Sequence, residues 1–381
     1  MNKKKILNAV DRPDAWKKAL SGKRVGLITN PSGVDRNLRL TFDIISKESD
    51  LVCLFSPEHG VRGDKQAGDH VESYTDEKTG LPVYSLFGGS KNIKPEILEG
   101  LDAVAFDIQD IGARFYTYMY TLSFAMEDCA KYKKEMIVFD RLNPLGGMSP
   151  QGTILEREFS STIGRFPLAT RFNMTIGEYA KYINDTENIS CDLTVIPIEG
   201  WTRDCIFQDT DLIWVSPSPN IPTPDSSFCY IGTCLAEGTN LSEGRGTAHP
   251  FEMIGAPWLD PESVISYMRS LDLPGVKFRP CHFAPTFSKH SGELCHGVML
   301  HITDHKAFLP FETGLYLFDH IRKNFEEFKI LRPSAGGRSH LDLLMGCNDF
   351  NFDDFNISAF LEKQKKQLSE YEEKIKLYYM Y

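Results

Sequence analysis

The sequence predicts an α/β fold, in which a parallel sheet covered by helices is followed by a smaller α+β domain. In the first half of the chain, short apolar runs alternate with segments of helical periodicity. This alternation is typical of parallel strands joined by crossover helices. From about residue 255 the pattern changes to longer strands and helices. We therefore expect a first domain at 1–254 and a second, smaller domain at 255–381.

The strands of the first domain are predicted from short runs of apolar residues. The run at 103–108 is the strongest, whereas 81–86 is weaker because a proline stands near its start. Such runs, apolar on both sides, are expected in a parallel sheet that helices cover on both faces. The predicted strands are 24–30, 51–55, 81–86, 103–108, 136–140 and 193–198.

Helices are predicted where apolar residues recur every three to four positions. In the first domain they fall at 38–49, 95–101, 118–134 and 175–184, the last with Thr175 as a cap. In the second domain, helices at 262–271, 312–325 and 357–377 accompany strands at 276–283 and 295–302. The segment 214–225 is rich in proline and apolar, so we expect an ordered loop that lies on the sheet.

Composition excludes several classes of protein. The net charge of −10 argues against a nucleic-acid-binding protein, which usually carries a basic face. Nine cysteines without close metal-type spacing argue against a zinc site or a disulfide framework. Membrane helices need about 18 consecutive apolar residues, and no such run occurs. Without an export signal, a cytoplasmic location is expected; a periplasmic or secreted protein whose N-terminus had been trimmed would look the same.

The segment Ser-Pro-Glu-His-Gly at 56–60 directly follows the strand predicted at 51–55. In open α/β sheets, ligands bind beyond the carboxyl ends of the strands. At such a place Glu58 could give or take a proton, and Gly60 could let a ligand approach the backbone. The alternative is a turn whose glutamate faces water.

Three more carboxylates follow predicted strands, namely Asp107, Asp110 and Asp140. The carboxyl ends of parallel strands meet at one edge of a sheet, so these groups are expected to converge there. Glycoside hydrolysis typically uses two carboxyl groups that flank the scissile bond. The alternative is that these aspartates cap helices or bind loop amides.

Two further segments combine charge with ligand-binding features. In 112–118, Arg114 could bind a carboxylate and Tyr116 could stack on a sugar. An Asp110–Arg114 ion pair at helical spacing is the alternative. The glycine-rich segment 237–247 holds Glu237, Asn240 and Arg245 and could wrap a polar ligand, although a surface loop is equally consistent.

Common catalytic motifs are missing from the sequence. No G-x-G-x-x-G follows the first strand, so a nucleotide-binding dehydrogenase is not supported. The pattern G-x-x-x-x-G-K-[ST] is absent, so the glycine-rich segment 237–247 does not resemble a phosphate-binding loop. The missing H-E-x-x-H and G-x-S-x-G patterns argue against a zinc protease and a serine hydrolase of the usual kinds.

Seven segments together resemble the NamZ-type exo-β-N-acetylmuramidase family, also called YbbC-like, from about residue 22 to the C-terminus. They lie at 22–33, 56–63, 107–118, 139–147, 218–224, 237–247 and 255–258. The resemblance implies a Rossmann-like domain and a smaller C-terminal domain, with the active site in a cleft between them. It also implies a glycosidase that releases N-acetylmuramic acid from the non-reducing end of peptidoglycan fragments, without a cofactor or a metal.

The resemblance assigns candidate catalytic residues. Glu58 would be the catalytic acid/base, and Glu237 the second catalytic group, with Asp107 or Asp110 as alternatives. His59 would orient Glu58 or bond a sugar hydroxyl, although a packed histidine is equally consistent. A retaining, an inverting and a substrate-assisted route all stay open.

The expected substrate carries a lactyl ether with a carboxylate, which calls for an arginine. Arg245 or Arg114 is expected to bind it. The remaining candidate substrate-binding residues are Arg62, Arg141, Asp107, Asp110, Tyr116 and Asn240. The alternatives are a non-catalytic muropeptide sensor and a hydrolase of another acidic amino-sugar conjugate. The sequence predicts no particular oligomeric state.

Overall fold

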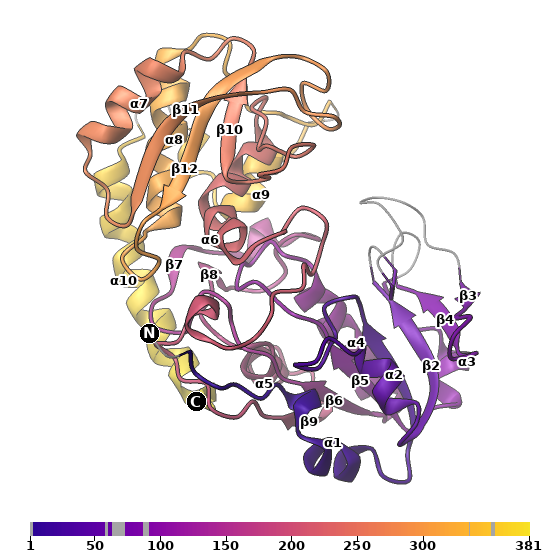
Figure 1. Ribbon diagram of the computed structural model, residues 1–381. Helices are drawn as coiled ribbons and strands as arrows, with labels where there is room; N and C mark the ends of the chain where they lie inside the picture. The colour runs from indigo at the N-terminus through magenta and orange to yellow at the C-terminus, as the bar shows by residue number, and fades with distance from the viewer. Residues whose placement is uncertain (1–2, 58–59, 63–72, 87–90, 335, 352–354) are drawn as a thin grey trace.

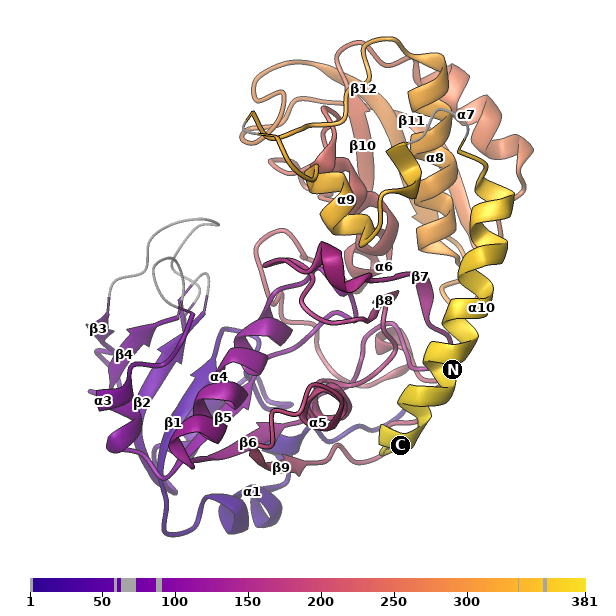
Figure 2. The ribbon, with the colours of Figure 1, turned by 180° about the vertical axis from the view of Figure 1, so that it is seen from behind.

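The computed structural model describes residues 3–57, 60–62, 73–86, 91–334, 336–351 and 355–381. It has a larger part built on a seven-stranded sheet and a smaller part built on a three-stranded sheet (Figure 1). The long helix α10 runs along both parts, as the view from behind also shows (Figure 2).

The large sheet has the strand order β3-β4-β2-β1-β5-β6-β9. Leaving out β3, the order is that of the doubly wound Rossmann fold, so the expected Rossmann-like sheet is confirmed. All six predicted strands are present, and each pairs in parallel with its neighbours in this set. The two-residue edge strand β3 pairs antiparallel with β4, so the whole sheet is mixed. The bounds are β1 (Arg24–Thr29), β2 (Asp50–Ser56), β3 (Tyr74–Thr75), β4 (Pro82–Ser85), β5 (Ala103–Asp107), β6 (Glu135–Phe139) and β9 (Asp192–Ile196).

Helices cover both faces of this sheet, which explains why the middle positions of its strands are mainly apolar. On one face, Val104 and Phe106 share a core with α3, α4 and α5, whereas Ala103 and Ala105 face α1 and α2 on the other. The predicted helix at 38–49 is shorter than expected. It begins only at Thr41, because Leu38 has a left-handed φ of 62° and Leu40 is extended, and it ends at Ile45. The bounds are α1 (Pro13–Leu20), α2 (Thr41–Ile45), α3 (Pro95–Glu99), α4 (Tyr118–Tyr132) and α5 (Ile176–Thr186).

The smaller part places an antiparallel sheet of order β10-β12-β11 against α7 and α8. Helix α6 packs on α8, and an added β-carbon on Gly314 would stand 2.7 Å from the Gly232 carbonyl oxygen. The predicted domain boundary after residue 254 falls within β10. The bounds are β10 (Met253–Ala256), β11 (Val276–Phe283), β12 (Cys295–Ile302), α6 (Pro224–Thr233), α7 (Pro261–Ser270), α8 (Pro310–Asn324), α9 (His340–Met345) and α10 (Ile357–Ile375).

Short elements and an ordered loop connect the two parts. The strands β7 (Gln151–Ile154) and β8 (Ala169–Arg171) form a two-stranded sheet, and β7 contacts α8 and α10. The predicted loop at 214–225 lies on the sheet up to Pro224, where α6 begins, and the Asn30 amide and the Tyr118 hydroxyl both donate to the Pro217 carbonyl. The 3₁₀ helices are η1 (Ala9–Asp11), η2 (Arg157–Phe159), η3 (Phe207–Asp209), η4 (Cys234–Gly238), η5 (Asp349–Asn351) and η6 (Lys376–Tyr378).

Three further features concern ligands, thiols and membranes. Among the described residues, no group of three or more histidine, cysteine, aspartate or glutamate side chains is arranged to hold a metal ion. All nine cysteines lie in the described part of the chain, and each is a buried free thiol. Within the same residues, no helix combines the length and the apolar character that crossing a membrane requires.

Candidate active site

A cavity of about 210 Å³ lies where the two parts of the molecule meet. The larger part contributes the loop that precedes α4, and the proline-rich loop adds a second wall. The smaller part contributes α6 and the glycine-rich segment 237–247. Its lining is Phe115, Tyr116, Thr117, Tyr118, Ile163, Ser218, Asn220, Ile221, Tyr230, Glu237, Arg245 and Phe251.

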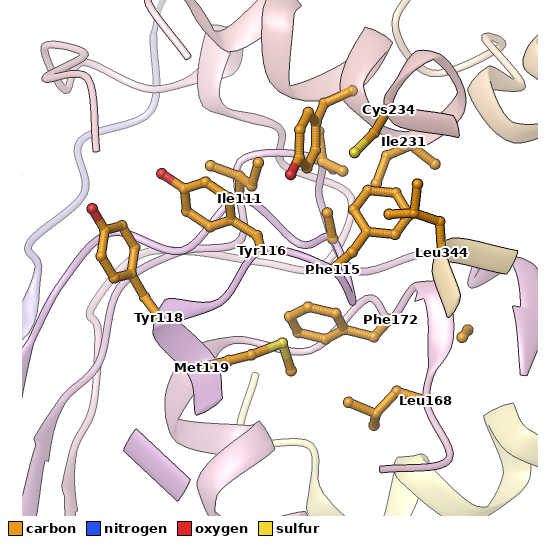
Figure 3. Packing of buried hydrophobic residues seen from close by; sticks show 14 of the residues in the cluster. Ile111, Phe115, Tyr116, Tyr118, Met119, Leu168, Phe172, Ile231, Cys234 and Leu344 are labelled. Atoms are coloured by element: carbon orange, nitrogen blue, oxygen red, sulfur yellow. The ribbon is translucent and has the colours of Figure 1, made fainter. Parts of the chain in front are cut away.

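Aromatic rings form one wall of this cavity. Tyr116 packs edge-on against both Tyr118 and Tyr230, with ring centroids 5.2 and 6.0 Å apart. Tyr230 packs in turn against Phe251 at 4.5 Å. Figure 3 shows Tyr116 and Tyr118 side by side, with both hydroxyls pointing the same way. Such a wall combines flat apolar faces with polar tips, which suits a sugar ring.

A charged cluster adjoins the aromatic wall, since the Arg245 guanidinium lies over the Phe251 ring. The Arg245 guanidinium lies 2.6 Å from Oε1 of Glu237 and 3.3 Å from Oε1 of Glu243. Lys289, from the loop between β11 and β12, lies 2.9 Å from Oε2 of Glu243. His340, at the start of α9, lies 3.6 Å from Oε2 of Glu237. Glu237 therefore lies between an arginine and a histidine at the edge of the aromatic cavity.

These contacts determine the charge of Glu237. Burial raises the pKa of its carboxyl, but His340 and Arg245 outweigh burial and leave that pKa below its ordinary value. Burial likewise opposes the charge of Arg245, yet Glu237 and Glu243 hold the pKa of that guanidinium above its ordinary value. Glu237 is consequently a carboxylate at neutral pH, able to accept a proton or to stabilise positive charge.

Backbone geometry positions Arg245 within its loop. Gly244 and Gly246, on either side of it, have left-handed φ values of 77° and 79°. An added β-carbon on Gly246 would also stand 2.7 Å from the Phe287 amide nitrogen. Both positions favour glycine, and the glycine-rich composition of 237–247 is explained by this turn.

Asn240 fixes the same loop from outside the cavity. Its side-chain amide donates to the Glu327 carbonyl at 2.8 Å, and its side-chain oxygen accepts from the Lys329 amide at 2.8 Å. The side chain thus joins the loop to the segment at 327–329, and Asn240 is not among the residues that line the cavity.

The predicted pair of carboxylates after β5 lies outside the cavity lining. Asp107 is buried and accepts two hydrogen bonds from Arg141, which also donates to the Val34 carbonyl. Asp110 is buried beside this strand end and accepts from the Gly112 amide at 2.7 Å. Burial raises the pKa of Asp110 to about 7, against the effect of the Gly112 and Ile111 amides.

Arg114 is fully buried and has a different role from either one expected for it. It donates to the carbonyl oxygens of Leu168, Leu344 and Met345 at 2.7–2.9 Å, and to that of Thr153. The alternative of an Asp110–Arg114 ion pair at helical spacing is wrong, because α4 begins only at Tyr118 and the guanidinium is used by carbonyls.

Arg62 is the last of the described candidates. Arg62 binds Asp76 with two hydrogen bonds of 2.6 and 2.9 Å, and its guanidinium lies over the Phe42 ring. Glu58 and His59 lie outside the described residues, so their roles stay predictions. The structure therefore brings Tyr116, Glu237 and Arg245 together in one cavity.

Several cavity residues were not predicted from the sequence. Ser218 and Asn220 belong to the proline-rich loop, which was expected to be ordered but was given no ligand role. Tyr230 lies on α6, a helix that periodicity did not reveal. His340, which contacts Glu237 but is not among the lining residues, lies on the six-residue α9. The run of prolines at 217–224 was the one sequence signal that could have indicated a ligand role for Ser218 and Asn220.

Comparisons with known proteins cover almost the whole chain. Two family models, the N-terminal and C-terminal parts of the exo-β-N-acetylmuramidase NamZ, match residues 25–225 and 228–381. The peptidoglycan β-N-acetylmuramidase NamZ of Bacillus subtilis is 49% identical over 338 residues, which cover 87% of this chain and 81% of that protein.

Solved structures show the same fold. A DUF1343 family protein from Bacteroides fragilis superposes with a TM-score of 0.89 at 34% identity, covering 100% of both chains. A second protein of that family from the same organism superposes with a TM-score of 0.79 at 27% identity, covering 99% of both. The family models and the Bacillus subtilis relative confirm the resemblance seen in the seven motifs, and the chain belongs to the NamZ family of exo-β-N-acetylmuramidases.

Proposed function

We propose that this protein is a glycosidase that releases N-acetylmuramic acid from the non-reducing end of peptidoglycan fragments, at the cavity between its two parts. One observation carries the proposal. Aromatic rings suited to a sugar ring and the Glu237–Arg245 ion pair line the same cavity, in a chain that is 49% identical to the peptidoglycan β-N-acetylmuramidase of Bacillus subtilis.

Glu237 is proposed as the ionised member of the catalytic pair. Hydrolysis of a glycoside passes through a transition state that resembles an oxocarbenium ion. A carboxylate that stays charged beside Arg245 and His340 can stabilise that positive charge, or activate a water or the 2-acetamido group. The same contacts make Glu237 a poor proton donor at neutral pH, because its pKa is lowered.

Glu58 is therefore the proposed acid, which protonates the leaving oxygen. Its assignment rests on the family motif at 56–63 and on its place in the sequence directly after β2. The carboxyl end of a parallel strand is where ligands of such sheets bind. The division of labour between two carboxyl groups follows the usual pattern of these enzymes, in which one is protonated and the other ionised.

Arg245 is proposed to bind the lactyl carboxylate of the substrate. Of the two arginines considered for this role, Arg245 lines the cavity with its side chain 24% exposed, whereas Arg114 is fully buried among carbonyl groups. A planar guanidinium can bind a carboxylate at two points and still contact Glu237. In the free enzyme, Glu237 and Glu243 would hold the Arg245 guanidinium in position for the substrate.

Two chromogenic substrates test the proposal, a β-N-acetylmuraminide and the matching β-N-acetylglucosaminide, which lacks the lactyl group. We expect the wild type to hydrolyse the muraminide faster. Glu58→Gln keeps the size of the side chain but removes its proton, so turnover should fall by about 10²- to 10⁴-fold. Glu262→Gln, at the exposed start of α7, is the matched control and should be unchanged.

The outcomes separate the candidate functions. Binding of a muramyl fragment without release of the sugar would contradict the glycosidase and indicate a sensor. Equal rates on both substrates would contradict a muramidase. Full activity of Glu58→Gln would remove Glu58 from the mechanism.

A further inference from the structure

The short helix α9 brings a histidine from the C-terminal part of the chain to Glu237. His340 is the first residue of α9, and its Nε2 lies 3.6 Å from Oε2 of Glu237. Arg245 contacts the other oxygen, Oε1, at 2.6 Å. The two oxygens of one carboxylate are thus held from different directions, one by the glycine-rich loop and one by α9.

The beginning of α9 is fixed in this position by close backbone packing. An added β-carbon on Gly238 would stand 2.5 Å from the amide nitrogen of Leu341, so the residue after Glu237 touches the first turn of α9 directly. Ser339 caps the helix, because its hydroxyl accepts from the Asp342 amide while Asp342 accepts from the Ser339 amide. His340 is therefore presented to Glu237 by a turn with little freedom to move.

The end of α9 is held by the larger part of the molecule. Arg114 donates to the carbonyls of Leu344 and Met345, which belong to the last turn. Gly346 then closes the helix with a left-handed φ of 72°, and an added β-carbon there would stand 2.9 Å from Nη2 of Arg114. Leu344 and Phe115, the neighbour of Arg114, belong to the same hydrophobic core cluster (Figure 3).

The groups around Glu237 differ in how their charge responds to pH. Arg245 is positive and contacts both Glu237 and Glu243. Lys289 also contacts Glu243. The buried side chains of Tyr230 and Cys234 lie nearby. Burial raises the pKa of both Tyr230 and Cys234 well above ordinary values, so they are neutral. Among arginine, lysine, glutamate, tyrosine, cysteine and histidine side chains, histidine is the one whose charge ordinarily changes between pH 5 and 8.

We propose that His340 is a positioning residue, which holds Glu237 as an oriented carboxylate through its imidazolium and is itself set in place by Gly238 and Arg114. This inference rests on the proposed function of the cavity. A positive charge on the imidazole opposes the protonation of Glu237, whose pKa His340 lowers. With this contact, Glu237 therefore stays ionised, and the enzyme stays active, at a lower pH than without it.

His340→Gln tests the proposal through the pH profile of kcat/KM on the muraminide. Glutamine removes the positive charge, so the pKa of Glu237 should rise and the acid limb should move to higher pH by roughly half to one unit. His340→Lys restores a cation and should return the limb toward its wild-type position. His305→Gln is the matched control, because His305 lowers the pKa of Asp225 in a similar pair outside the cavity lining.

A second readout does not depend on activity. The carboxyl ¹³C signal of Glu237, identified by its loss in Glu237→Gln, should titrate at higher pH in His340→Gln than in the wild type. An unchanged titration midpoint and an unmoved acid limb would overturn the role of His340 while leaving the muramidase intact. A wild type that fails to hydrolyse the muraminide would contradict the proposed function, and the carboxyl titration would still decide the role of His340.

Discussion

At the scale of single residues, selectivity for the muramyl group is expected to depend on the shape of Arg245. Arg245→Lys keeps the positive charge beside Glu237, but one ammonium cannot contact Glu237, Glu243 and a substrate carboxylate as a planar fork does. Turnover of the muraminide should fall by about 10- to 100-fold, the scale of one charged hydrogen bond. Hydrolysis of the glucosaminide should fall less.

The decisive quantity in this experiment is the difference between the loss of rate on the muraminide and the loss of rate on the glucosaminide. Arg157→Lys, in an exposed ion pair with Glu187, controls for the substitution itself and should alter neither rate. An equal loss of rate on both substrates would show that Arg245 supports Glu237 but does not recognise the lactyl group.

Ion pairs between candidate residues were not predictable from their spacing in the sequence. Glu237 and Arg245 were both candidates in one glycine-rich segment, but their pairing was seen only in the structure. Asp107 and Arg141 end neighbouring strands and pair with each other, which makes the carboxylate a structural partner of the arginine. Such a pairing depends on strand order in three dimensions, and the residue types alone were equally consistent with a ligand site.

At the scale of elements, Arg114 joins three segments of backbone that are far apart in the sequence. It contacts β7 through Thr153, the approach to β8 through Leu168, and the end of α9. Burial lowers the pKa of Arg114 to about 10, so it is still positive at neutral pH. In Arg114→Lys a single ammonium cannot reach all three, and the free energy of unfolding should fall by about 3 kcal/mol or more.

Urea unfolding measures this loss, and hydrogen exchange over 340–346 locates it. We expect faster exchange in α9 of Arg114→Lys, together with a lower unfolding midpoint. Arg157→Lys again serves as the control and should stay within about 0.5 kcal/mol of the wild type. Unchanged stability with unchanged exchange would show that Arg114 does not hold α9.

The strands were more predictable than the short helices, for a physical reason. A strand covered on both faces is a nearly continuous apolar run, as in β5 and β6, where the one charged residue stands at a strand end, and this signal is visible without knowing the fold. Helix α9 spans only six residues, which is too short for periodicity to be read, and α6 begins at one of the prolines that indicated a loop. Both helices contribute to the site through tertiary contacts.

At the scale of the whole molecule, the C-terminal segment connects the smaller part to the large sheet. Helix α10 runs along both parts (Figure 2), and the Tyr381 hydroxyl donates to the buried Asp140 at 2.7 Å. Asp140 also accepts from Thr175 and from the Gly177 amide at the start of α5. This connection keeps the two sides of the cavity in a fixed relation.

The cavity itself could not be located from the sequence, although its motifs could. Its walls come from 115–118, 218–221 and 230–251, which the chain brings together only when α6 packs on α8 and the proline-rich loop lies on the sheet. The family resemblance implied a cleft between two domains, and the residues at this junction include Tyr116, Glu237 and Arg245. Glu58 stays a prediction from its motif.

The direction of cleavage is the most direct test of the central claim that the cavity accepts a terminal muramyl unit. Two β-linked disaccharides would be compared, one with N-acetylmuramic acid at its non-reducing end and the other with N-acetylglucosamine there. Mass spectrometry of the products should show free N-acetylmuramic acid from the first disaccharide and an intact second one. Cleavage of the second, or of neither, would contradict the account.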